Sequence, residues 1–369
     1  MVKVGINGFG RIGRIAFRIG VLKHSDELQF SAINTSGSMP VSGWAHLTNY
    51  DTMYREFQLK VKSEELKVPE EATDDDPLIG NLMISEKNIK IPVLAQRDPA
   101  KIPWGKYGVD VVIESTGVFT DEEGAKKHAI GGAKKVVISA PVKGGNVATY
   151  IIGVNEKDEL PQILSNSSCT TNSVAPVASI LHSKFGIEKA LMTTVHSYTD
   201  DQNLQDASHK DLRRARAAAQ NIIPTSTGAA ISTTETIPAL KGLFDGMSLR
   251  VPTATGSITD FTVLLKKNVT VEEVNNVFKE AVENPLYKGI IAVTEEPLVS
   301  SDIIGRSESA IVDLSLTQVV AGNLIKIFAW YDNEWGYANR LIEQVIRAGR
   351  TLGGNKVPTD PLTLSFKTQ

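Results

Sequence analysis

The sequence predicts an α/β protein in which a doubly wound parallel sheet is followed by an α+β domain with a largely antiparallel sheet. Three observations support this prediction. An alternating apolar pattern at the start of the chain runs into a glycine turn and then a helical pattern. Strand and helix patterns then alternate over roughly the first 165 residues, which is typical of parallel sheets. From Thr259 onward, alternating apolar residues indicate antiparallel strands.

The first predicted strand, Val2 to Asn7, is followed by the glycine turn Gly8-Phe9-Gly10-Arg11-Ile12-Gly13. Between a strand and a helix, this spacing indicates a Rossmann-type dinucleotide site. Gly8 permits the tight turn, Gly10 lets the backbone approach a pyrophosphate, and Gly13 lets helix and strand pack closely. The helix N-terminus then holds the phosphates. The expected cofactor-binding residues here are Asn7, Gly8, Gly10, Arg11 and Ile12, and a purely structural glycine turn is the alternative.

The second predicted strand, Leu28 to Asn34, ends without the carboxylate that binds the adenosine ribose 2′-hydroxyl of NAD. The segment Asn34-Thr35-Ser36-Gly37-Ser38 stands there instead. A 2′-phosphate meets no like charge at this strand end, and the hydroxyls together with Arg97 offer it donors. The sequence therefore predicts that NADP is used at least as well as NAD. The alternative is that Asn34 and Thr35 hold the ribose of NAD.

Two further strands are predicted at Val109 to Glu114 and Lys135 to Ser139. Ligands of doubly wound sheets bind at the carboxyl ends of the strands. We therefore expect the segment after the first of these strands, Ser115-Thr116-Gly117, to contribute to the cofactor site.

The single cysteine, Cys169, lies in the polar segment Ser165 to Asn172, directly before a helical apolar stripe. A lone cysteine is more often a buried structural residue, but this polar setting at a helix start favours a reactive thiol. The helix macrodipole is expected to lower the pKa of that thiol. His196 ends a β-branched strand and is predicted to pair with Cys169, the alternative being a structural histidine.

Arginines and hydroxyl residues recur after Cys169. Arg214 and Arg250 would each be surface cations if taken singly. Together with Thr170, Thr199 and Thr227, they predict phosphate sites around one thiol.

Composition excludes several classes of function. The 369 residues carry a net charge of −3, so neither a nucleic-acid nor a membrane surface is expected. The chain enters a strand immediately after Met1, so no signal peptide is expected, and the absence of cysteine pairs favours the cytoplasm. The acidic segment Glu64 to Asp76 is predicted to be a solvated loop rather than a metal site, and no metal is expected.

Five segments, in order along almost the whole chain, resemble glyceraldehyde-3-phosphate dehydrogenase. They are Gly5–Arg14, Ser165–Asn172, Thr194–Thr199, His209–Arg216 and Trp330–Tyr337. The resemblance implies that Cys169 is the nucleophile and His196 its base. It also implies a thioester formed by hydride transfer from the Cys169 adduct to a nicotinamide, which inorganic phosphate then cleaves to 1,3-bisphosphoglycerate.

The resemblance assigns further residues. Asn333 is expected to hold the nicotinamide carboxamide, with Thr120 and Ser139 bordering the cofactor cleft. The expected C3-phosphate site of the substrate consists of Thr199, Asp201 and Arg250. The expected inorganic-phosphate site consists of Ser168, Thr170, Arg214, Thr227 and Gly228.

The expected organisation is a cofactor domain at residues 1–168, completed by a helix at about 334–353, and a catalytic domain at residues 169–333. Residues 354–369 form a tail. By resemblance only, the protein is expected to be a homotetramer.

Four departures from the family pattern stand out. Ser173 replaces a second cysteine, and Tyr54 replaces a common histidine. Thr35 replaces the usual aspartate. Ala207-Ser208 replaces leucine-proline, as in NADP-using photosynthetic members, and Ser208 is expected to reach the cofactor pocket of a neighbouring subunit.

Alternatives from other classes remain open at this point. An NAD-specific glycolytic form and an erythrose 4-phosphate dehydrogenase are the enzyme alternatives. A redox sensor would need the thiol but not Thr227, Arg214 and Arg250. An interaction protein that kept the fold would need neither the reactive thiol nor these three phosphate-binding residues.

Overall fold

The computed structural model describes residues 1–353, which fall into two compact units. The first contains Met1–Thr149, Lys157–Ser167 and the chain from Ala338 onward. The second contains Tyr150–Glu156 and Ser168–Tyr337. The predicted tail, residues 354–369, lies outside the described residues.

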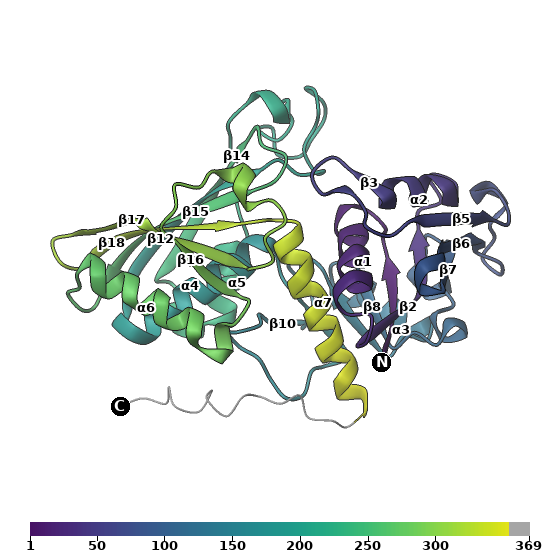
Figure 1. Ribbon diagram of the computed structural model, residues 1–369, viewed down its shortest axis with the longest axis horizontal. Helices are drawn as coiled ribbons and strands as arrows, with labels where there is room; N and C mark the ends of the chain where they lie inside the picture. Colours follow the sequence, from purple (N-terminus) through teal and green to yellow (C-terminus); the bar gives the residue numbers. More distant parts are fainter. Residues whose placement is uncertain (354–369) are drawn as a thin grey trace. The chain divides into compact units, whose positions relative to one another are not determined.

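A nine-stranded sheet organises the first unit, in the order β10-β11-β9-β8-β1-β2-β7-β6-β5 (Figure 1). Its strands are β1 (Val2–Asn7), β2 (Leu28–Thr35), β5 (Val61–Glu65), β6 (Leu78–Ile84), β7 (Ile89–Ala95), β8 (Val111–Glu114), β9 (Lys135–Ile138), β10 (Ala148–Thr149) and β11 (Ile163–Ser165). Every pair from β10 to β7 is parallel, which confirms the predicted fold class. The β5-β6-β7 edge is antiparallel, which the sequence analysis did not foresee.

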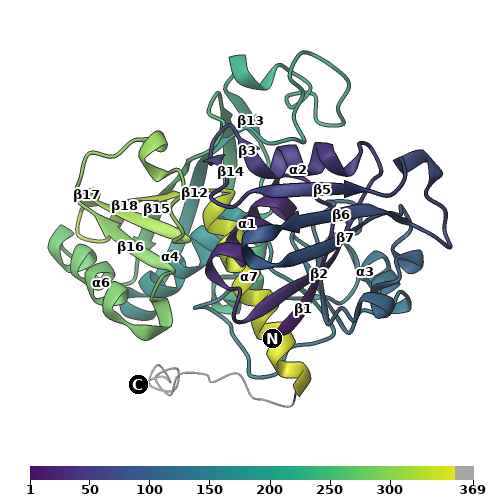
Figure 2. The ribbon, with the colours of Figure 1, turned by 45° about the vertical axis from the view of Figure 1, so that its right-hand side comes forward.

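The first unit also contains the helices α1 (Arg11–Lys23), α2 (Val41–Asn49), α3 (Glu122–Ile130) and α7 (Trp335–Arg350). Helix α7 belongs to this unit from Ala338 onward. A short hairpin of β3 (Tyr50–Asp51) and β4 (Arg55–Glu56) follows α2. The predicted apolar stripe of α1 is buried, with Ile15 and Ile19 fully covered. The end of α7 packs closely on the start of β1, because a Cβ added at Gly349 would overlap the side chain of Val2 (Figure 2).

The second unit is built on a seven-stranded sheet in the order β13-β14-β12-β15-β18-β17-β16. Its strands are β12 (Ile187–Ser197), β13 (Ile223–Thr225), β14 (Phe244–Val251), β15 (Ser257–Leu265), β16 (Ile291–Thr294), β17 (Ala310–Val320) and β18 (Leu324–Tyr331). Four neighbouring pairs are antiparallel, and only β12–β14 and β16–β17 are parallel. The predicted largely antiparallel sheet is therefore confirmed.

Helices α4 (Cys169–Phe185), α5 (Ala229–Thr236) and α6 (Val271–Glu283) contribute to one apolar core with this sheet (Figure 1). Leu181 of α4, Phe278 of α6 and Phe261 of β15 are fully buried in it. Every second side chain along the strands points to the other face of the sheet. On that face Leu191 is 65 % exposed and Met247 is 43 % exposed. The sheet is thus covered on one face and apolar on parts of the other.

Within residues 1–353, no helix has both the length and the apolarity needed to cross a membrane. Nor does this range contain a group of three or more His, Cys, Asp or Glu side chains arranged to hold a metal ion.

Candidate active site

Cys169 is the first residue of α4, as the sequence predicted. Ser168 caps the helix, because its hydroxyl accepts a hydrogen bond from the Thr171 amide at 3.1 Å. A hydroxyl cap satisfies one of the free amides of a first helical turn. Cys169 as a whole residue is of intermediate exposure.

His196 lies at the end of β12, and its Nε2 is 3.3 Å from Sγ of Cys169. Its Nδ1 is 2.7 Å from the carbonyl oxygen of Ser197. Because a carbonyl can only accept, Nδ1 carries the ring proton of the neutral imidazole. Nε2 therefore presents its lone pair to the thiol, which is the arrangement a general base requires.

Burial has the largest effect on the pKa of both His196 and Cys169. It lowers the pKa of His196 to about 3, and the nearby Arg250 guanidinium adds to this effect. Burial also raises the pKa of the Cys169 thiol, although Arg250 acts in the opposite direction. The expectation that the helix start lowers the pKa of this thiol is therefore wrong, because desolvation of a thiolate outweighs the helix dipole. Both directions favour a neutral thiol and a neutral imidazole in the resting pair.

Tyr331, the last residue of β18, packs against His196 and hydrogen-bonds to Thr170, the residue after Cys169. Its hydroxyl is 3.1 Å from Oγ1 of Thr170 and 2.7 Å from Oγ1 of Thr194. Its ring meets the His196 ring edge to face, with centroids 5.9 Å apart. Burial raises the pKa of Tyr331, so it stays protonated. This role was not predicted from the sequence, although Tyr331 lies in the Trp330–Tyr337 segment that carries the family resemblance.

Arg250 lies beside His196 because the two residues are in register on the parallel strands β14 and β12. Its guanidinium donates to Oγ1 of Thr199 at 2.8 Å. Thr199 in turn donates to Asp201, and Arg214 donates to the same carboxylate at 2.5 Å. The two predicted phosphate sites are therefore one connected cluster, joined at Asp201.

Two arginines and two carboxylates make up the charges of this cluster, and Asp201 is ionised within it. Desolvation alone would raise the pKa of Asp201, but the Thr199 hydrogen bond and the two arginines outweigh it, so the pKa is lowered. Asp211 lies 3.7 Å from the same Arg214, so two carboxylates balance the two guanidinium groups. The guanidinium N–H groups still offer charge-assisted donors to a phosphate.

Other expected phosphate residues differ in their availability. Thr227 and Gly228 precede α5, where the Thr227 hydroxyl accepts from the Ala229 amide at 3.2 Å. Ser168 is engaged as the α4 cap. Thr170 is 4 % exposed and points to Tyr331. Its hydroxyl therefore supports the site from inside rather than facing a ligand.

Asn333 is buried in the second unit with a fixed orientation. Its Oδ1 accepts from the Gly256 amide at 3.1 Å and from the Ser257 hydroxyl at 3.0 Å. This leaves the Nδ2 amide group as its donor, which fits the carbonyl oxygen of a carboxamide.

The first unit contains a cavity of about 420 Å³ at the carboxyl ends of β1, β2, β7 and β8. Nine expected cofactor residues line it: Asn7, Gly8, Gly10, Asn34, Thr35, Ser36, Arg97, Ser115 and Thr116. Phe9, Trp44, Gln96, Val118 and Phe119 also line it and were not predicted. Val118 and Phe119 directly follow the expected Ser115-Thr116-Gly117 segment, which was a usable signal.

The glycine turn fits a pyrophosphate. Gly8 has φ +94°, and a Cβ there would meet the Ser115 backbone at 2.7 Å. A Cβ at Gly13 would lie 2.2 Å from the Gly8 carbonyl oxygen, so only glycine allows this helix and strand to approach. A Cβ at Gly10 would meet open space, which leaves room for a phosphate at the start of α1.

The adenosine end of this cavity differs in one respect from the prediction. Thr35 is 2 % exposed and its hydroxyl donates to the Leu94 carbonyl oxygen at 3.1 Å. The expectation that this hydroxyl binds a 2′-phosphate is therefore wrong. The hydroxyls of Ser36 and Ser38, 3.0 Å apart, and the exposed Arg97 are the donors at this end.

Seven expected cofactor residues are not among those lining the cavity: Arg11, Ile12, Gly117, Thr120, Ser139, Ser208 and Asn333. Arg11 instead pairs with Asp51 at 2.5 Å. Ser208 is exposed on the long loop of the second unit that follows β12.

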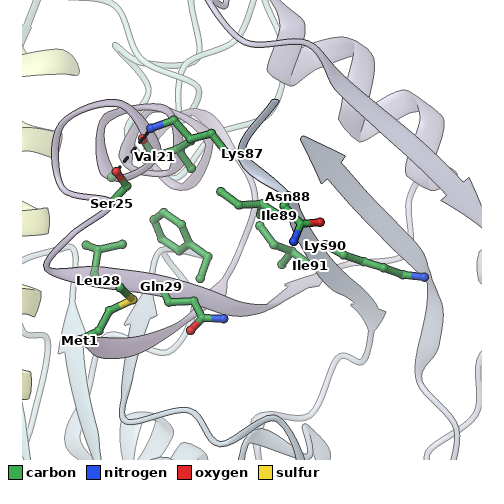
Figure 3. Close-up of a pocket in the computed structure, with 12 residues that line it drawn as sticks. Met1, Val21, Ser25, Leu28, Gln29, Lys87, Asn88, Ile89, Lys90 and Ile91 are labelled. Carbon is green, nitrogen blue, oxygen red and sulfur yellow. Dashed lines mark hydrogen bonds between the residues drawn. The ribbon is translucent and has the colours of Figure 1, made fainter. Parts of the chain in front are cut away.

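A second cavity, of about 610 Å³, lies near the amino ends of β2 and β7, away from the expected site (Figure 3). Lys87 at its rim donates to the Val21 carbonyl oxygen at 3.2 Å. It contains none of the predicted site residues.

A dinucleotide pocket and a thiol with its own base are what a dehydrogenase needs if it oxidises an aldehyde through a thioester. Residues 2–122 match the NAD-binding domain of glyceraldehyde 3-phosphate dehydrogenase, and residues 168–333 match its C-terminal domain. The chain therefore belongs to the glyceraldehyde-3-phosphate dehydrogenase family, as the sequence resemblance indicated, and is an NAD(P)-dependent dehydrogenase.

Three relatives show how broad this similarity is. A Streptomyces coelicolor glyceraldehyde-3-phosphate dehydrogenase is 49 % identical over 95 % of this chain and 99 % of its own length. The chloroplastic glyceraldehyde-3-phosphate dehydrogenase B of Pisum sativum is 47 % identical over 98 % of this chain and 77 % of its own length. A Bacillus cereus glyceraldehyde-3-phosphate dehydrogenase 1 is 46 % identical over 93 % of this chain and 97 % of its own length.

Proposed function

We propose that this chain catalyses the reversible oxidation of glyceraldehyde 3-phosphate to 1,3-bisphosphoglycerate. Inorganic phosphate is the second substrate, and NAD(P) is the oxidant. The observation that carries the proposal is the 3.3 Å contact between Sγ of Cys169 and the unprotonated Nε2 of His196, beside the Arg250 cluster.

The first step is addition of the thiol to the aldehyde. His196 Nε2 takes the thiol proton as Sγ bonds to the carbonyl carbon, and returns it to the carbonyl oxygen, giving a hemithioacetal. Arg250 and Thr199 hold the C3 phosphate of the substrate and so orient the aldehyde towards Sγ. Cys169 needs no free thiolate at rest, because the proton moves within the pair.

Oxidation then requires a base and an acceptor. His196 Nε2 removes the hemithioacetal hydroxyl proton, and loss of a hydride from the same carbon would leave a thioester on Cys169. A bound nicotinamide dinucleotide supplies the two-electron acceptor, with Asn7, Gly8, Gly10 and Asn333 among the residues that would hold it.

Inorganic phosphate completes the reaction. We assign its binding to Arg214, Thr227 and Gly228, with Ser168 and Thr170 as supports. Phosphate oxygen attacks the thioester carbon, and the Cys169 sulfur leaves and recovers its proton from His196. A charge-assisted contact from Arg214 lowers the repulsion between this phosphate and the substrate phosphate.

We further propose that NADP is accepted at least as well as NAD. No carboxylate is among the residues that line the cavity with Ser36, and Arg97 has no hydrogen-bond or ion-pair partner within residues 1–353. These residues and Ser208 of a neighbouring subunit would bind the 2′-phosphate. Arg11, Ile12, Gly117, Thr120 and Ser139 are assigned to the cofactor site by family resemblance alone.

A homo-oligomer, a tetramer by resemblance, completes the proposal. The exposed Leu191 and Met247 on the outer face of the second sheet offer an apolar surface for a second copy. We place the protein in the cytoplasm, because a nucleophilic thiol needs a reducing compartment. Its net charge of −3 argues against nucleic-acid or membrane partners.

The test is initial-rate kinetics with NAD and with NADP, each with and without inorganic phosphate. Turnover that depends on phosphate supports the proposal. Phosphate-independent turnover would indicate hydrolysis of the thioester, and equal rates with erythrose 4-phosphate would favour that alternative. Absence of turnover with both cofactors would favour a redox sensor or an interaction protein instead of an enzyme. A hundredfold preference for NAD in kcat/KM would refute the NADP assignment.

A further inference from the structure

We infer that the loop between β5 and β6, residues 66–77, is a specificity element of the cofactor site, and that Asp74 is its positioning residue. Asp74 acts on the adenosine end of the site through Gln96 and Arg97. The inference rests on the proposed use of this cavity for NADP.

A row of hydrogen-bonded side chains crosses the floor of the cavity. Glu114, Asn7 and Asn34 are in register on the neighbouring strands β8, β1 and β2. Asn7 donates to Glu114 at 2.6 Å, and Asn34 donates to Asn7 at 2.8 Å. Asn34 also donates to the Gln96 carbonyl oxygen at 2.8 Å and accepts from the Gln96 amide at 3.0 Å. The row therefore fixes the backbone at Gln96, directly after β7.

The Gln96 side chain continues the row beyond the sheet. Its Nε2 donates to Oδ1 of Asp74 at 2.9 Å, and its Oε1 accepts from the Asp98 amide at 2.9 Å. The ionised Asp74 carboxylate can only accept, so it determines which end of the Gln96 amide faces the loop. The other end then closes a turn around Arg97. Asp74 thus sets the backbone from which the Arg97 side chain projects.

The same loop contacts the opposite side of the adenosine end. A Cβ at Gly37, within the Ser36–Ser38 turn, would lie 3.6 Å from Cβ of Pro69. Just before the loop, the Glu65 carboxylate accepts from the amides of Val41 and Ser42 at 3.1 Å and 2.6 Å, at the start of α2. The loop therefore runs close to the turn, and it positions Arg97 through Gln96.

Charge pairing explains how an acidic loop can border a phosphate site. Asp74 pairs with Lys101, and Asp76 pairs with Lys67 at 2.6 Å. These lysines neutralise the carboxylates nearest the cavity, and Arg97 pairs with none of the carboxylates in residues 1–353. Arg97 is consequently left as an unshared cation at the rim, which is where a 2′-phosphate would carry about −1.5 to −2 charges.

Adenosine 2′,5′-bisphosphate and 5′-AMP are suitable probes, because they differ only at the 2′ position. Binding of each to the full-length chain is measured by calorimetry, for the wild type and for Asp74→Ala. The matched control is Asp75→Ala, an exposed neighbour with no hydrogen bond or ion pair in the described chain. Asp74→Asn serves as the conservative variant, since its Oδ1 can still accept from Gln96.

Asp74→Ala and Asp74→Asn both release Lys101 from its ion pair, so these two variants are compared with each other. We expect the preference of Asp74→Ala for the bisphosphate to be about two- to fivefold lower than that of Asp74→Asn, the usual range for an exposed charged contact. Affinity for 5′-AMP, kcat with NAD and the melting temperature should be unchanged. Asp75→Ala should behave as wild type, and Asp74→Asn should retain most of the preference. In the Gln96→Ala background, the Asp74→Ala effect should disappear, because the two residues act in series.

An equal loss for both probes would overturn the inference, since Asp74 would then be merely structural. An unchanged preference, the same effect from Asp75→Ala, or a wild type without preference for the bisphosphate would also overturn it. These outcomes are separate from failure of the proposed function, which would appear as absence of phosphate-dependent turnover with either cofactor.

Discussion

At the scale of single residues, the neutral state of the Cys169–His196 pair is the main determinant of the chemistry. Both groups sit where burial penalises charge, yet each is 3.3 Å from the partner that can exchange a proton with it. The site therefore delays charge separation until an aldehyde is present.

Replacing Cys169 by serine tests the nucleophile. A hydroxyl is a much weaker nucleophile than a thiol at neutral pH, so turnover of Cys169→Ser should fall by several orders of magnitude. The fold and cofactor affinity should be retained, because serine can occupy the same helix start. Stopped-flow reduction of NAD(P) measures the loss. Wild-type enzyme that keeps full activity after stoichiometric iodoacetamide labelling at Cys169 would contradict this assignment.

The low pKa of His196 predicts a pH-dependent contribution to stability. In the unfolded chain this histidine titrates near its ordinary value of about 6.5, whereas in the folded chain its pKa is about 3. Between these values the unfolded state binds the extra proton, so the free energy of unfolding falls as pH falls. One proton corresponds to about 1.4 kcal/mol per pH unit. Above about pH 6.5 the contribution is complete.

His196→Asn should remove this slope, which denaturant unfolding between pH 4 and 7 can measure. The same variant should slow turnover by about 10²–10⁴-fold, the usual effect of losing an acid–base group. The control is His46→Asn, at an exposed position on α2. If wild type and His196→Asn show parallel stability profiles, His196 has the same pKa in the folded enzyme as in the unfolded chain, and the low pKa assigned to it is wrong.

At the scale of elements, the loop after β12 joins two anion positions through one carboxylate. Arg250 from β14 and Arg214 from the loop both contact the Thr199–Asp201 segment. A change at one arginine therefore alters the charge felt at the other position. The sequence suggested two independent sites, because it does not show that Asp201 bridges them.

Arg250→Leu should raise KM for glyceraldehyde 3-phosphate by tenfold or more, since a charge-assisted hydrogen bond is worth about 1.5–3 kcal/mol. It should also raise KM for inorganic phosphate, because Asp201 would then be shared by Arg214 alone. Arg216→Leu is the matched control: this exposed arginine pairs with Asp206 instead. A variant whose only defect is in the KM for cofactor would refute the assignment.

The elements themselves were predictable to different degrees. The first strand, the glycine turn and α1 were evident because burial imposes a clear period on residues 2–22. The β5-β6-β7 edge was not, since charged side chains interrupt its alternation and its partners are set by long-range pairing. Trp44 and Gln96 could not be assigned to the cavity from the sequence, because the turns that bring them to Asn34 are tertiary.

At the scale of the whole molecule, the two faces of the second sheet differ in cover. The inner face carries the apolar core with α4, α5 and α6, and His196 and Arg250 lie at the end of it that meets Cys169. The outer face presents Leu191 at 65 % exposure and Met247 at 43 % exposure. Exposed apolar area on a sheet favours association with another copy of the same surface.

Leu191→Glu is therefore expected to weaken assembly. Two copies of this face brought together would bury a carboxylate without a partner, which costs more than the apolar contact it replaces. Light scattering after gel filtration should show a smaller species than the wild type at the same concentration. The control is Ile130→Glu, which adds the same charge at a 74 % exposed position on α3 in the first unit. If Ser208 of a neighbouring copy contributes to the cofactor pocket, the ratio of KM for NADP to KM for NAD should be higher for the smaller species than for the wild type. An unchanged mass for Leu191→Glu would place the interface on another surface.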